Sequence, residues 1–341
     1  MRPVKFMVVG AGKTGSTFIK QIAKDGERLG IELTAIVEPE KDKSAALLSE
    51  FPESKRPLLL SNVGSLTKVP DDQRPEAAIV CVPAKIQSEI AEACLSTGMH
   101  CLVEKPVGFS AVNCRELAEK AKKYKRHLQG SFPERWIFAE LWNHWKPKQG
   151  VWTINAIRVN PFVPRSSDMD VLHDLMVTDL DLFVLLSSVF DLPKIVKVRA
   201  WGRKLRSSLV DYAIVALDLE DGGMARFFAS RLSAETNRAW EMTGPDWHAS
   251  FNFMRRTLKR FERAGRDVNL FQAVQSRAEL SEPIAYELEF FRRTLEQSVP
   301  VPENTKMDFG DLSSLRAFPH TIYRTHEIVD EILSCMQVFD H

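Results

Sequence analysis

Short apolar runs alternate with amphipathic segments through the first 130 residues. The run KFMVV at 5–9 is almost entirely apolar and ends in two β-branched valines, which is typical of a strand buried on both faces of a parallel sheet. The following STFIKQIAKDG, at 16–26, has its apolar residues at helical spacing. The same pattern predicts further strands at 76–83 and 100–106, and further helices at 86–98 and 110–127. This alternation predicts an α/β fold with a doubly wound parallel sheet.

Runs of strands replace this alternation after residue 130. A helical segment at 133–145 precedes strand-like runs at 151–162 and 195–205. The stretch 210–233 predicts two strands joined through Glu220–Gly223, a sequence that favours a hairpin. Successive strands predict a large, open and mainly antiparallel sheet with one covered face. We therefore expect one domain at 1–129 and an α+β domain at 130–341.

Three later segments are predicted to be helical. FMRRTLKRFERAGR at 253–266 interleaves basic and apolar residues, which indicates a basic amphipathic helix. Its cations could face acidic substrate groups, a membrane surface, a partner subunit or solvent alone. The segments 283–297 and 312–333 have helical spacing and predict the last two helices.

Composition and charge narrow the choice of partner. The chain has 341 residues, of which 44% are hydrophobic and 27% are charged, as expected of a chain that buries a sizeable core. Because 46 Lys and Arg nearly balance 45 Asp and Glu, no global charge favours nucleic acid, and small molecules become the expected partners. No apolar run reaches the roughly 20 residues that a membrane span needs. The histidines lack metal-ligand spacing, so no metal is expected.

The cysteines point to a reducing compartment. There are five of them, an odd number, and none forms a C-x-x-C pair. Most lie in apolar runs, which is typical of buried thiols in a cytoplasmic protein. The five are Cys81, Cys94, Cys101, Cys114 and Cys335.

The first strand runs directly into a glycine-rich turn. Gly10, Gly12 and Gly15 satisfy G-x-G-x-x-G between a strand and a helix, the order found at dinucleotide sites of the Rossmann type. Gly10 permits the tight turn, Gly12 lets the backbone approach a pyrophosphate, and Gly15 lets helix and strand pack closely. The helix N-terminus offers unpaired N–H groups to the anion. The expected contacts are Gly10, Ala11, Gly12, Lys13, Thr14 and Gly15.

An acidic residue follows the second strand. ELTAIVEPE at 32–40 places Glu38 about 20 residues beyond the turn, where a carboxylate accepts hydrogen bonds from the adenosine ribose. A carboxylate there also repels a 2′-phosphate, so the sequence favours NAD over NADP. The alternative is that Glu38 only begins a solvated loop and that Lys41 or Lys43 holds a phosphate.

Several motifs together resemble the Gfo/Idh/MocA family of nicotinamide-dependent oxidoreductases. They are VVGAGKTG, AIVEP, VCVP, GMHCLVEKP and a downstream aspartate pattern, in the family's order along nearly the whole chain. The resemblance implies that Val82, Pro83, Glu104, Lys105 and Pro106 also line the cofactor site. It implies that Lys105 lies between substrate and nicotinamide, often before a cis peptide bond. It also implies that the free face of the second sheet forms dimers or tetramers and that the last helix packs back on the first domain.

The helix that begins near Val171 departs from the family pattern. The family has an aspartate and, four residues later, a histidine; Asp174 matches the aspartate, but Thr178 stands in place of the histidine. A threonine hydroxyl has no comparable proton affinity and can only relay or hydrogen-bond. Lys105 could be the base instead, if burial beside the positive nicotinamide ring weakens its hold on its proton, or His173 could serve. The remaining alternative is a sensor or scaffold protein that binds the cofactor without rapid turnover.

A proline-bounded segment precedes this helix. Arg158 and Arg165 suit an anionic substrate, because a guanidinium binds phosphate or carboxylate bidentately. Arg165 could equally form an ordinary ion pair with Asp168 or Asp170. The segment looks like the branch of the family that oxidises nucleotide-linked amino sugars, the UDP-N-acetylglucosamine 3-dehydrogenases. The resemblance implies a cytoplasmic NAD(P)-dependent oxidoreductase that uses Lys105, Asp174 and Thr178 in catalysis, with Arg165 and Asp170 also binding the substrate.

Overall fold

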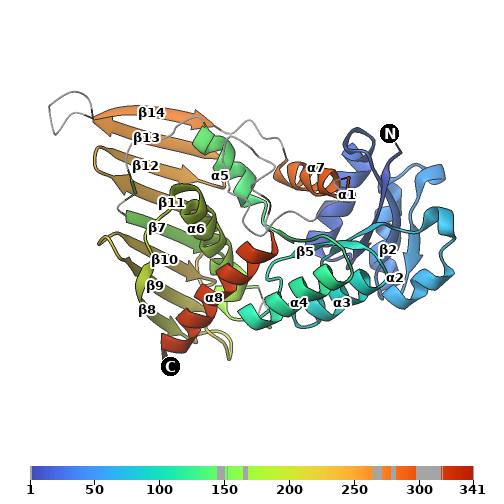
Figure 1. Ribbon diagram of the computed structural model, residues 1–341, viewed down its shortest axis with the longest axis horizontal. Coiled ribbons are helices and arrows are strands. Elements are labelled where there is room, and N and C mark those ends of the chain that lie inside the picture. The colour runs from blue at the N-terminus through green and yellow to red at the C-terminus, as the bar shows by residue number, and fades with distance from the viewer. Residues whose placement is uncertain are drawn as a thin grey trace. The chain divides into compact units, whose positions relative to one another are not determined.

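The computed structural model describes residues 2–143, 150–151, 153–163, 168–263, 271–277, 282–296, 316 and 318–340. Contacts between Cα atoms divide the chain into two compact units. The first unit contains residues 2–133 and, from late in the sequence, helix α7 and the described residues of 316–323. The second unit contains the described residues of 134–281 and residues 324–340. Figure 1 labels most of the helices and strands of both units.

The first unit is built on a six-stranded sheet in the order β3-β2-β1-β4-β5-β6, in which every pair of neighbours is parallel. Its strands are β1 (Val4–Val9), β2 (Ile31–Val37), β3 (Leu58–Leu60), β4 (Ala77–Val80), β5 (His100–Glu104) and β6 (Leu128–Ser131). Its helices are α1 (Lys13–Leu29), α2 (Lys41–Leu47), α3 (Ala84–Ser96), α4 (Ala111–Lys123) and α7 (Pro283–Leu295). The predicted doubly wound parallel sheet is confirmed.

An apolar layer between this sheet and helices α1 and α7 forms the core of the first unit. Phe6, Ile19 and Phe291 are fully buried in it, and the rings of Phe6 and Phe291 meet edge to face at 5.9 Å. Such aromatic pairs stabilise a core beyond the area that they bury. A helix from late in the sequence therefore completes the core of the N-terminal sheet.

The second unit contains a nine-stranded sheet in the order β14-β13-β12-β11-β7-β10-β9-β8-β15. Its strands are β7 (Thr153–Val159), β8 (Ile195–Arg203), β9 (Tyr212–Leu219), β10 (Met224–Ser230), β11 (Asn237–Gly244), β12 (Trp247–Asn252), β13 (Thr257–Arg263), β14 (Phe271–Arg277) and β15 (Gln337–Phe339). Neighbours are antiparallel except for β7 with β10 and β8 with β15. The predicted open, mainly antiparallel sheet and the β9–β10 hairpin are confirmed.

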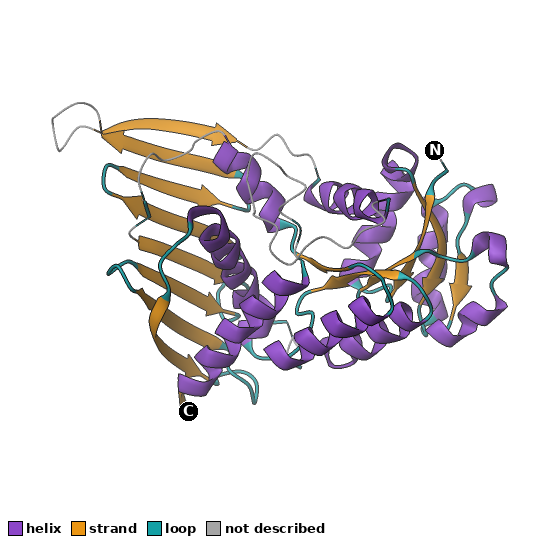
Figure 2. Cartoon of the chain, in the orientation of Figure 1, coloured by secondary structure: helices purple, strands orange, loops and turns teal. Residues whose placement is uncertain are grey.

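Helices α5 (Glu134–Asn143) and α6 (Val177–Phe190) lie on one side of this sheet in Figure 2, and α8 (Pro319–Cys335) precedes its last strand. Every residue of α6 from Val177 to Leu186 is buried. A helix that is almost apolar all round has to be covered on every side, which explains its place in the interior.

The predicted basic helix at 253–266 is wrong. Residues Thr257–Arg263 form strand β13, which pairs antiparallel with β12 across a turn at 253–256. Leu258 is fully buried and the next residue, Lys259, is exposed, so the segment also fits the two-residue period of a strand. Pairing with the neighbouring strands, which local spacing does not reveal, decides between the two periods.

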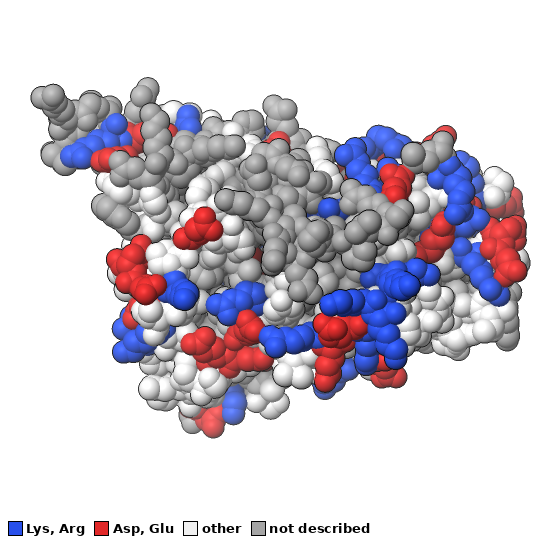
Figure 3. Space-filling model, viewed as in Figure 1, with Lys and Arg blue, Asp and Glu red and all other residues white. Residues whose placement is uncertain are grey.

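Charged side chains of both signs are interspersed on the face drawn in Figure 3, in line with the formal net charge of +1. No described helix is long and apolar enough to cross a bilayer.

Candidate active site

The glycine-rich turn joins β1 to α1 at the carboxyl end of the parallel sheet. Gly10 has a φ of +91°, and a Cβ there would lie 2.4 Å from the carbonyl oxygen of Cys81. A Cβ at Gly15 would lie 1.8 Å from the carbonyl oxygen of Gly10. Only glycine fits either position: at Gly10 both the backbone angle and the close approach exclude a side chain, and at Gly15 the close approach alone excludes one.

The N-terminus of α1 fits an anionic group. A Cβ on Gly12 would meet no atom within 4 Å, so the backbone there borders open space. Gly12 caps the helix without a side-chain hydrogen bond, and the first turn has no acidic residue. The first N–H groups, which begin at Lys13 and Thr14, are therefore available to a phosphate, and the helix dipole favours negative charge at this end.

Glu38 follows strand β2 and contacts this loop directly. Its carboxylate accepts a 2.8 Å hydrogen bond from the backbone N–H of Ala11 and a 3.1 Å bond from that of Glu40. Lys43 is 2.6 Å from the carboxylate of Glu40, and this hydrogen bond raises the pKa of Lys43. The acid predicted to select the ribose thus adjoins the loop predicted to hold the pyrophosphate.

The Glu104–Lys105–Pro106 tripeptide begins at the last residue of strand β5, at the same edge of the sheet. Lys105 is half-buried and precedes a cis peptide bond to Pro106. Helix α3 holds this backbone: the amide of Gln87 donates to the carbonyl oxygens of Glu104 and Pro106, the second at 2.7 Å, and Ser88 Oγ donates to that of Val107 at 3.0 Å. Val82 and Pro83 lie in the short loop between the neighbouring strand β4 and helix α3, and Pro83 is the N-cap of α3.

Sequence reasoning missed the residues that support this edge. Gln87 is only 1% exposed, and Glu287 of helix α7 is equally buried. Glu287 accepts hydrogen bonds from Ser131 Oγ at 2.7 Å and from the backbone N–H of Phe132 at 2.8 Å, just where β6 ends. One signal was present: Glu287 lies four residues before Phe291, on the apolar face of its helix.

A thiol lies beneath the glycine-rich turn. Burial, followed by the nearby carboxylates of Glu104 and Glu287, raises the pKa of Cys81 well above its usual value. Cys81 therefore stays a neutral thiol at physiological pH, which suits packing better than nucleophilic chemistry.

In the second unit, the helix predicted from Val171 begins with a π-helical turn, Leu172–Met176, and continues as α6. Asp170 accepts hydrogen bonds from the backbone N–H groups of Leu172 and His173, at 2.9 and 3.1 Å, and lies 2.8 Å from Nδ1 of His173. Burial opposes ionisation of Asp170, but these bonds outweigh it and lower its pKa. Single π turns occur often at functional sites.

Asp174 adjoins a buried arginine. Its carboxylate is 4.0 Å from the guanidinium of Arg231, which is 1% exposed. Arg231 also contacts Asp211 at 2.7 Å and the carbonyl oxygen of Met169 at 2.8 Å. Burial alone would raise the pKa of Asp211, but backbone N–H groups of 205–207 donate to it and hold the pKa far below its usual value. Arg231 is thus a fixed cation beside Asp174.

Other polar residues of the second unit have different surroundings. Arg158 is 3% exposed and pairs with Asp179 at 2.8 Å and Glu134 at 3.0 Å, so the idea that it faces an anionic substrate is wrong. Asp181 is fully buried against Arg135. Thr178 is 2% exposed, and its hydroxyl has no hydrogen bond to any other described residue. Arg165 lies outside the described residues.

No group of three His, Cys, Asp or Glu side chains that could hold a metal ion occurs within the described ranges.

Comparison with known proteins supports this description. Residues 4–132 match the GFO_IDH_MocA family model, described as an oxidoreductase family with an NAD-binding Rossmann fold. The matched residues, which form the parallel sheet and the glycine-rich turn, are thus similar to the NAD-binding domain of the Gfo/Idh/MocA oxidoreductases. The UDP-N-acetylglucosamine 3-dehydrogenase of Acidithiobacillus ferrooxidans is 27% identical over 302 residues, which cover 86% of this chain and 89% of that protein.

Solved structures show the same fold for this chain. The A. ferrooxidans dehydrogenase superimposes with a TM-score of 0.79 at 22% identity, over 98% of both chains. A 3-ketoreductase from Actinomadura kijaniata, solved with NADP and TDP-benzene, superimposes with a TM-score of 0.75 at 16% identity, over 100% of both chains. At these identities the likeness concerns the fold alone, so the chemistry has to be argued from this chain's residues.

Proposed function

We propose that this protein is an NAD-dependent oxidoreductase that transfers hydride between nicotinamide and a secondary alcohol or ketone of a nucleotide-linked sugar. One observation carries the proposal: the glycine-rich turn, Glu38 and Lys105 all follow strands that end at the same edge of one parallel sheet. Ligands of doubly wound folds bind at this carboxyl edge. The relative that matches 86% of the chain, a UDP-N-acetylglucosamine 3-dehydrogenase, supports the substrate class.

The cofactor proposed is NAD. The residues of the turn, 10–15, would hold the pyrophosphate, Glu38 the adenosine ribose, and Val82, Pro83 and the 104–106 tripeptide the remainder. The A. kijaniata ketoreductase binds NADP. Here, however, Glu38 places a carboxylate beside the loop, and Lys43 is paired with Glu40. When bound, the nicotinamide supplies the hydride acceptor or donor.

Lys105 is the group proposed to take the proton from the sugar hydroxyl or return it. It follows β5 directly, and its backbone neighbours are held by Gln87 and Ser88 of α3. His173 suits this role less well, because it is 2% exposed and its Nδ1 already faces Asp170. A proton donor or acceptor has to reach the substrate before its proton affinity matters.

Asp174 and Thr178 are proposed to orient the sugar hydroxyls, with Asp170 shaping the start of the same helix. Arg231 fixes the carboxylate of Asp174 from the protein side. Arg165 remains the proposed contact for the anionic, nucleotide-linked part, since a guanidinium recognises phosphate bidentately.

We also propose a cytoplasmic homo-oligomer that assembles through the outer face of the nine-stranded sheet. Four apolar residues are register partners across four neighbouring strands of this sheet. They are Trp201 of β8, Ile214 of β9, Phe228 of β10 and Ile157 of β7. Trp201, Ile214 and Ile157 are 41%, 37% and 39% exposed. A continuous apolar row on an open sheet suits a second copy of the same surface. The free thiols suit a reducing compartment.

The test is to mix the purified protein with NAD and a panel of UDP- and TDP-linked sugars and to follow reduced nicotinamide by its absorbance. Turnover that is lost in Lys105→Ala, but kept in the surface control Lys123→Ala, would establish the reaction and its proton-transferring residue. Tight NADH binding without turnover on any sugar would refute the dehydrogenase. The comparisons give no support to the alternative, a nicotinamide-binding sensor.

A further inference from the structure

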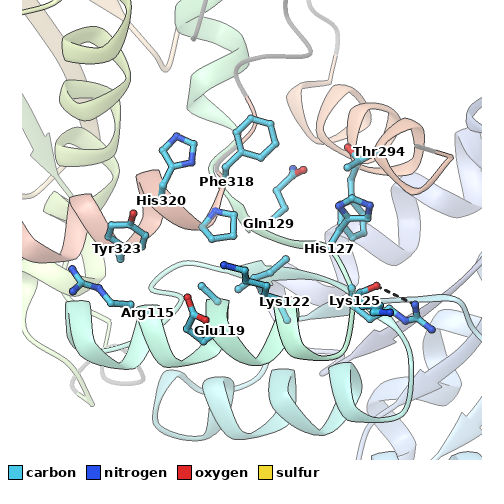
Figure 4. Close-up of a pocket in the computed structure, with 16 residues that line it drawn as sticks. Arg115, Glu119, Lys122, Lys125, His127, Gln129, Thr294, Phe318, His320 and Tyr323 are labelled. Carbon is cyan, nitrogen blue, oxygen red and sulfur yellow. Dashed lines mark hydrogen bonds between the residues drawn. The ribbon is translucent and has the colours of Figure 1, made fainter. Parts of the chain in front are cut away.

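A cavity of about 750 Å3 lies in the first unit, at the edge strand β6. It is bordered by the C-terminal half of α4, the start of β6, the end of α7 and the start of α8. Its volume is within the range of about 300–1,000 Å3 that small-molecule sites occupy. Figure 4 shows side chains of α4, among them Arg115 and Lys122, on one side and His320 and Tyr323 of α8 on the other.

A buried amide points to a ligand in this cavity. Strand register places Ile36, Val8, Ile79 and Leu102 in one apolar row across the sheet, and the row ends on Gln129. Gln129 lines the cavity and is 3% exposed, yet its Nε2 has no hydrogen-bond partner in the described part of the chain. A buried donor without a partner is uncommon, because desolvating it costs free energy. An acceptor atom supplied by a ligand would satisfy it.

The lining has the charge and the rings for a particular class of ligand. Four of its described residues are Lys or Arg, against the single carboxylate of Glu119; the four are Arg115, Lys122, Lys125 and Arg126. The rings of Phe318 and His320 stack at 5.9 Å, and the guanidinium of Arg115 lies 5.0 Å from the centre of the Tyr323 ring. Cations bind phosphate, and flat side chains bind a flat base.

We propose that this cavity binds a nucleoside phosphate, with its phosphate toward the cations of α4, its base against the rings of α8 and a base acceptor atom on Gln129 Nε2. The site is separate from the dinucleotide loop. Gln129 lies on the edge strand β6, whereas the glycine-rich turn and Glu38 follow β1 and β2, and strands β4 and β5 lie between β1 and β6. The cofactor loop and this second ligand would therefore lie at different strands of the sheet.

Calorimetric titration of the NADH-saturated protein tests the proposal, because NADH keeps the nucleotide probes out of the cofactor loop. The probes are AMP, GMP, UMP and CMP, with inorganic phosphate and adenosine as the two halves of a ligand. At least one nucleotide should bind below about 1 mM, and both halves should bind at least about tenfold more weakly. Lys122→Gln should weaken that nucleotide about tenfold.

Gln129→Leu provides the second variant. Leucine continues the apolar row, so the melting temperature should be unchanged or higher while nucleotide affinity falls about fivefold or more. Lys123→Gln, the same charge change one residue away on α4 and outside the cavity, should leave affinity unchanged. Absence of binding for all four nucleotides overturns the proposal. Phosphate that binds as tightly as the nucleotides, or affinities that Lys122→Gln and Gln129→Leu leave unchanged, also overturn it.

Discussion

The backbone N–H of Ala11 donates a 2.8 Å hydrogen bond to the Glu38 carboxylate, which ties the glycine-rich loop to the end of β2. A 2′-phosphate bound beside this loop would meet a negative charge. We expect Glu38→Gln, which keeps an acceptor oxygen but removes the charge, to reduce the preference for NADH over NADPH by about tenfold. Fluorescence titration with both nucleotides measures the ratio, and Glu32→Gln, at an exposed position near the other end of β2, is the control. An unchanged ratio would show that Glu38 does not select the cofactor.

Gly12 and Gly15 should respond differently to alanine. At Gly15 the new Cβ would lie 1.8 Å from a backbone oxygen, so the turn has to shift and stability should fall by roughly 1–3 kcal/mol. At Gly12 the Cβ meets nothing, so the melting temperature should hold while NADH affinity falls about tenfold. Thermal unfolding and NADH titration of both variants separate the two effects. Equal loss of stability in both would contradict the assignment of Gly12 to the pyrophosphate.

Thr178 should matter for turnover and not for stability. Because its hydroxyl bonds no other described residue, the isosteric Thr178→Val should keep the melting temperature of the wild type. If the hydroxyl contacts the sugar, kcat/KM should fall about tenfold, and Thr178→Ser should retain most of it. A Thr178→Val variant with the kcat/KM of the wild type would show that the Thr178 hydroxyl does not contact the substrate. Histidine at this position would overpack a buried space, so a gain in turnover is not expected from it.

Stability should depend on pH through His100. Burial, then the neighbouring His127 and Arg126, lower the pKa of His100 from 6.5 to about 4. Between pH 6.5 and pH 4, His100 is protonated in the unfolded chain but stays neutral in the folded protein. Its effect on the free energy of unfolding is therefore absent above pH 6.5, and stability is lost progressively as the pH falls from 6.5 toward 4.

His100→Asn keeps an acceptor for the backbone N–H of His127, which now bonds Nδ1 at 2.9 Å, but it cannot titrate. Between pH 7 and pH 5 the free energy of unfolding of the wild type should fall by about 1 kcal/mol more than that of this variant, after allowance for the solvent that reaches the ring. Urea unfolding at both pH values measures the difference, and His248→Asn is the control. Identical pH dependence in the wild type and His100→Asn would exclude this role.

The outer row of the nine-stranded sheet should control assembly. Ile214 is 37% exposed at its centre, so Ile214→Lys should weaken self-association about 100-fold or more by placing a charge in the contact. Val112→Lys, a similar change at an exposed aliphatic residue of α4, is the control. Analytical ultracentrifugation reports the mass of each. A wild type that remains a monomer at about 100 μM would refute the interface.

Local sequence determined much of this protein. The parallel first sheet, the glycine-rich turn before α1, the β9–β10 hairpin and the placement of Glu38 and Lys105 at strand ends all followed from the order of residues. The physical reason is that backbone angles, the two periods of burial and the N–H groups of a helix end depend on neighbours in the chain.

Only the tertiary structure decided which partners each side chain meets. Glu287 lies 156 residues from Ser131 in sequence, and Arg158 reaches Asp179 across 21 residues, so neither contact leaves a local signature. Strand pairing made 257–263 a strand although its spacing also suits a helix. Gln129 is a buried amide at the end of an apolar row, and that row exists only once the strands have paired. Burial and pairing are properties of the folded chain, since they depend on surfaces that meet only after it has folded.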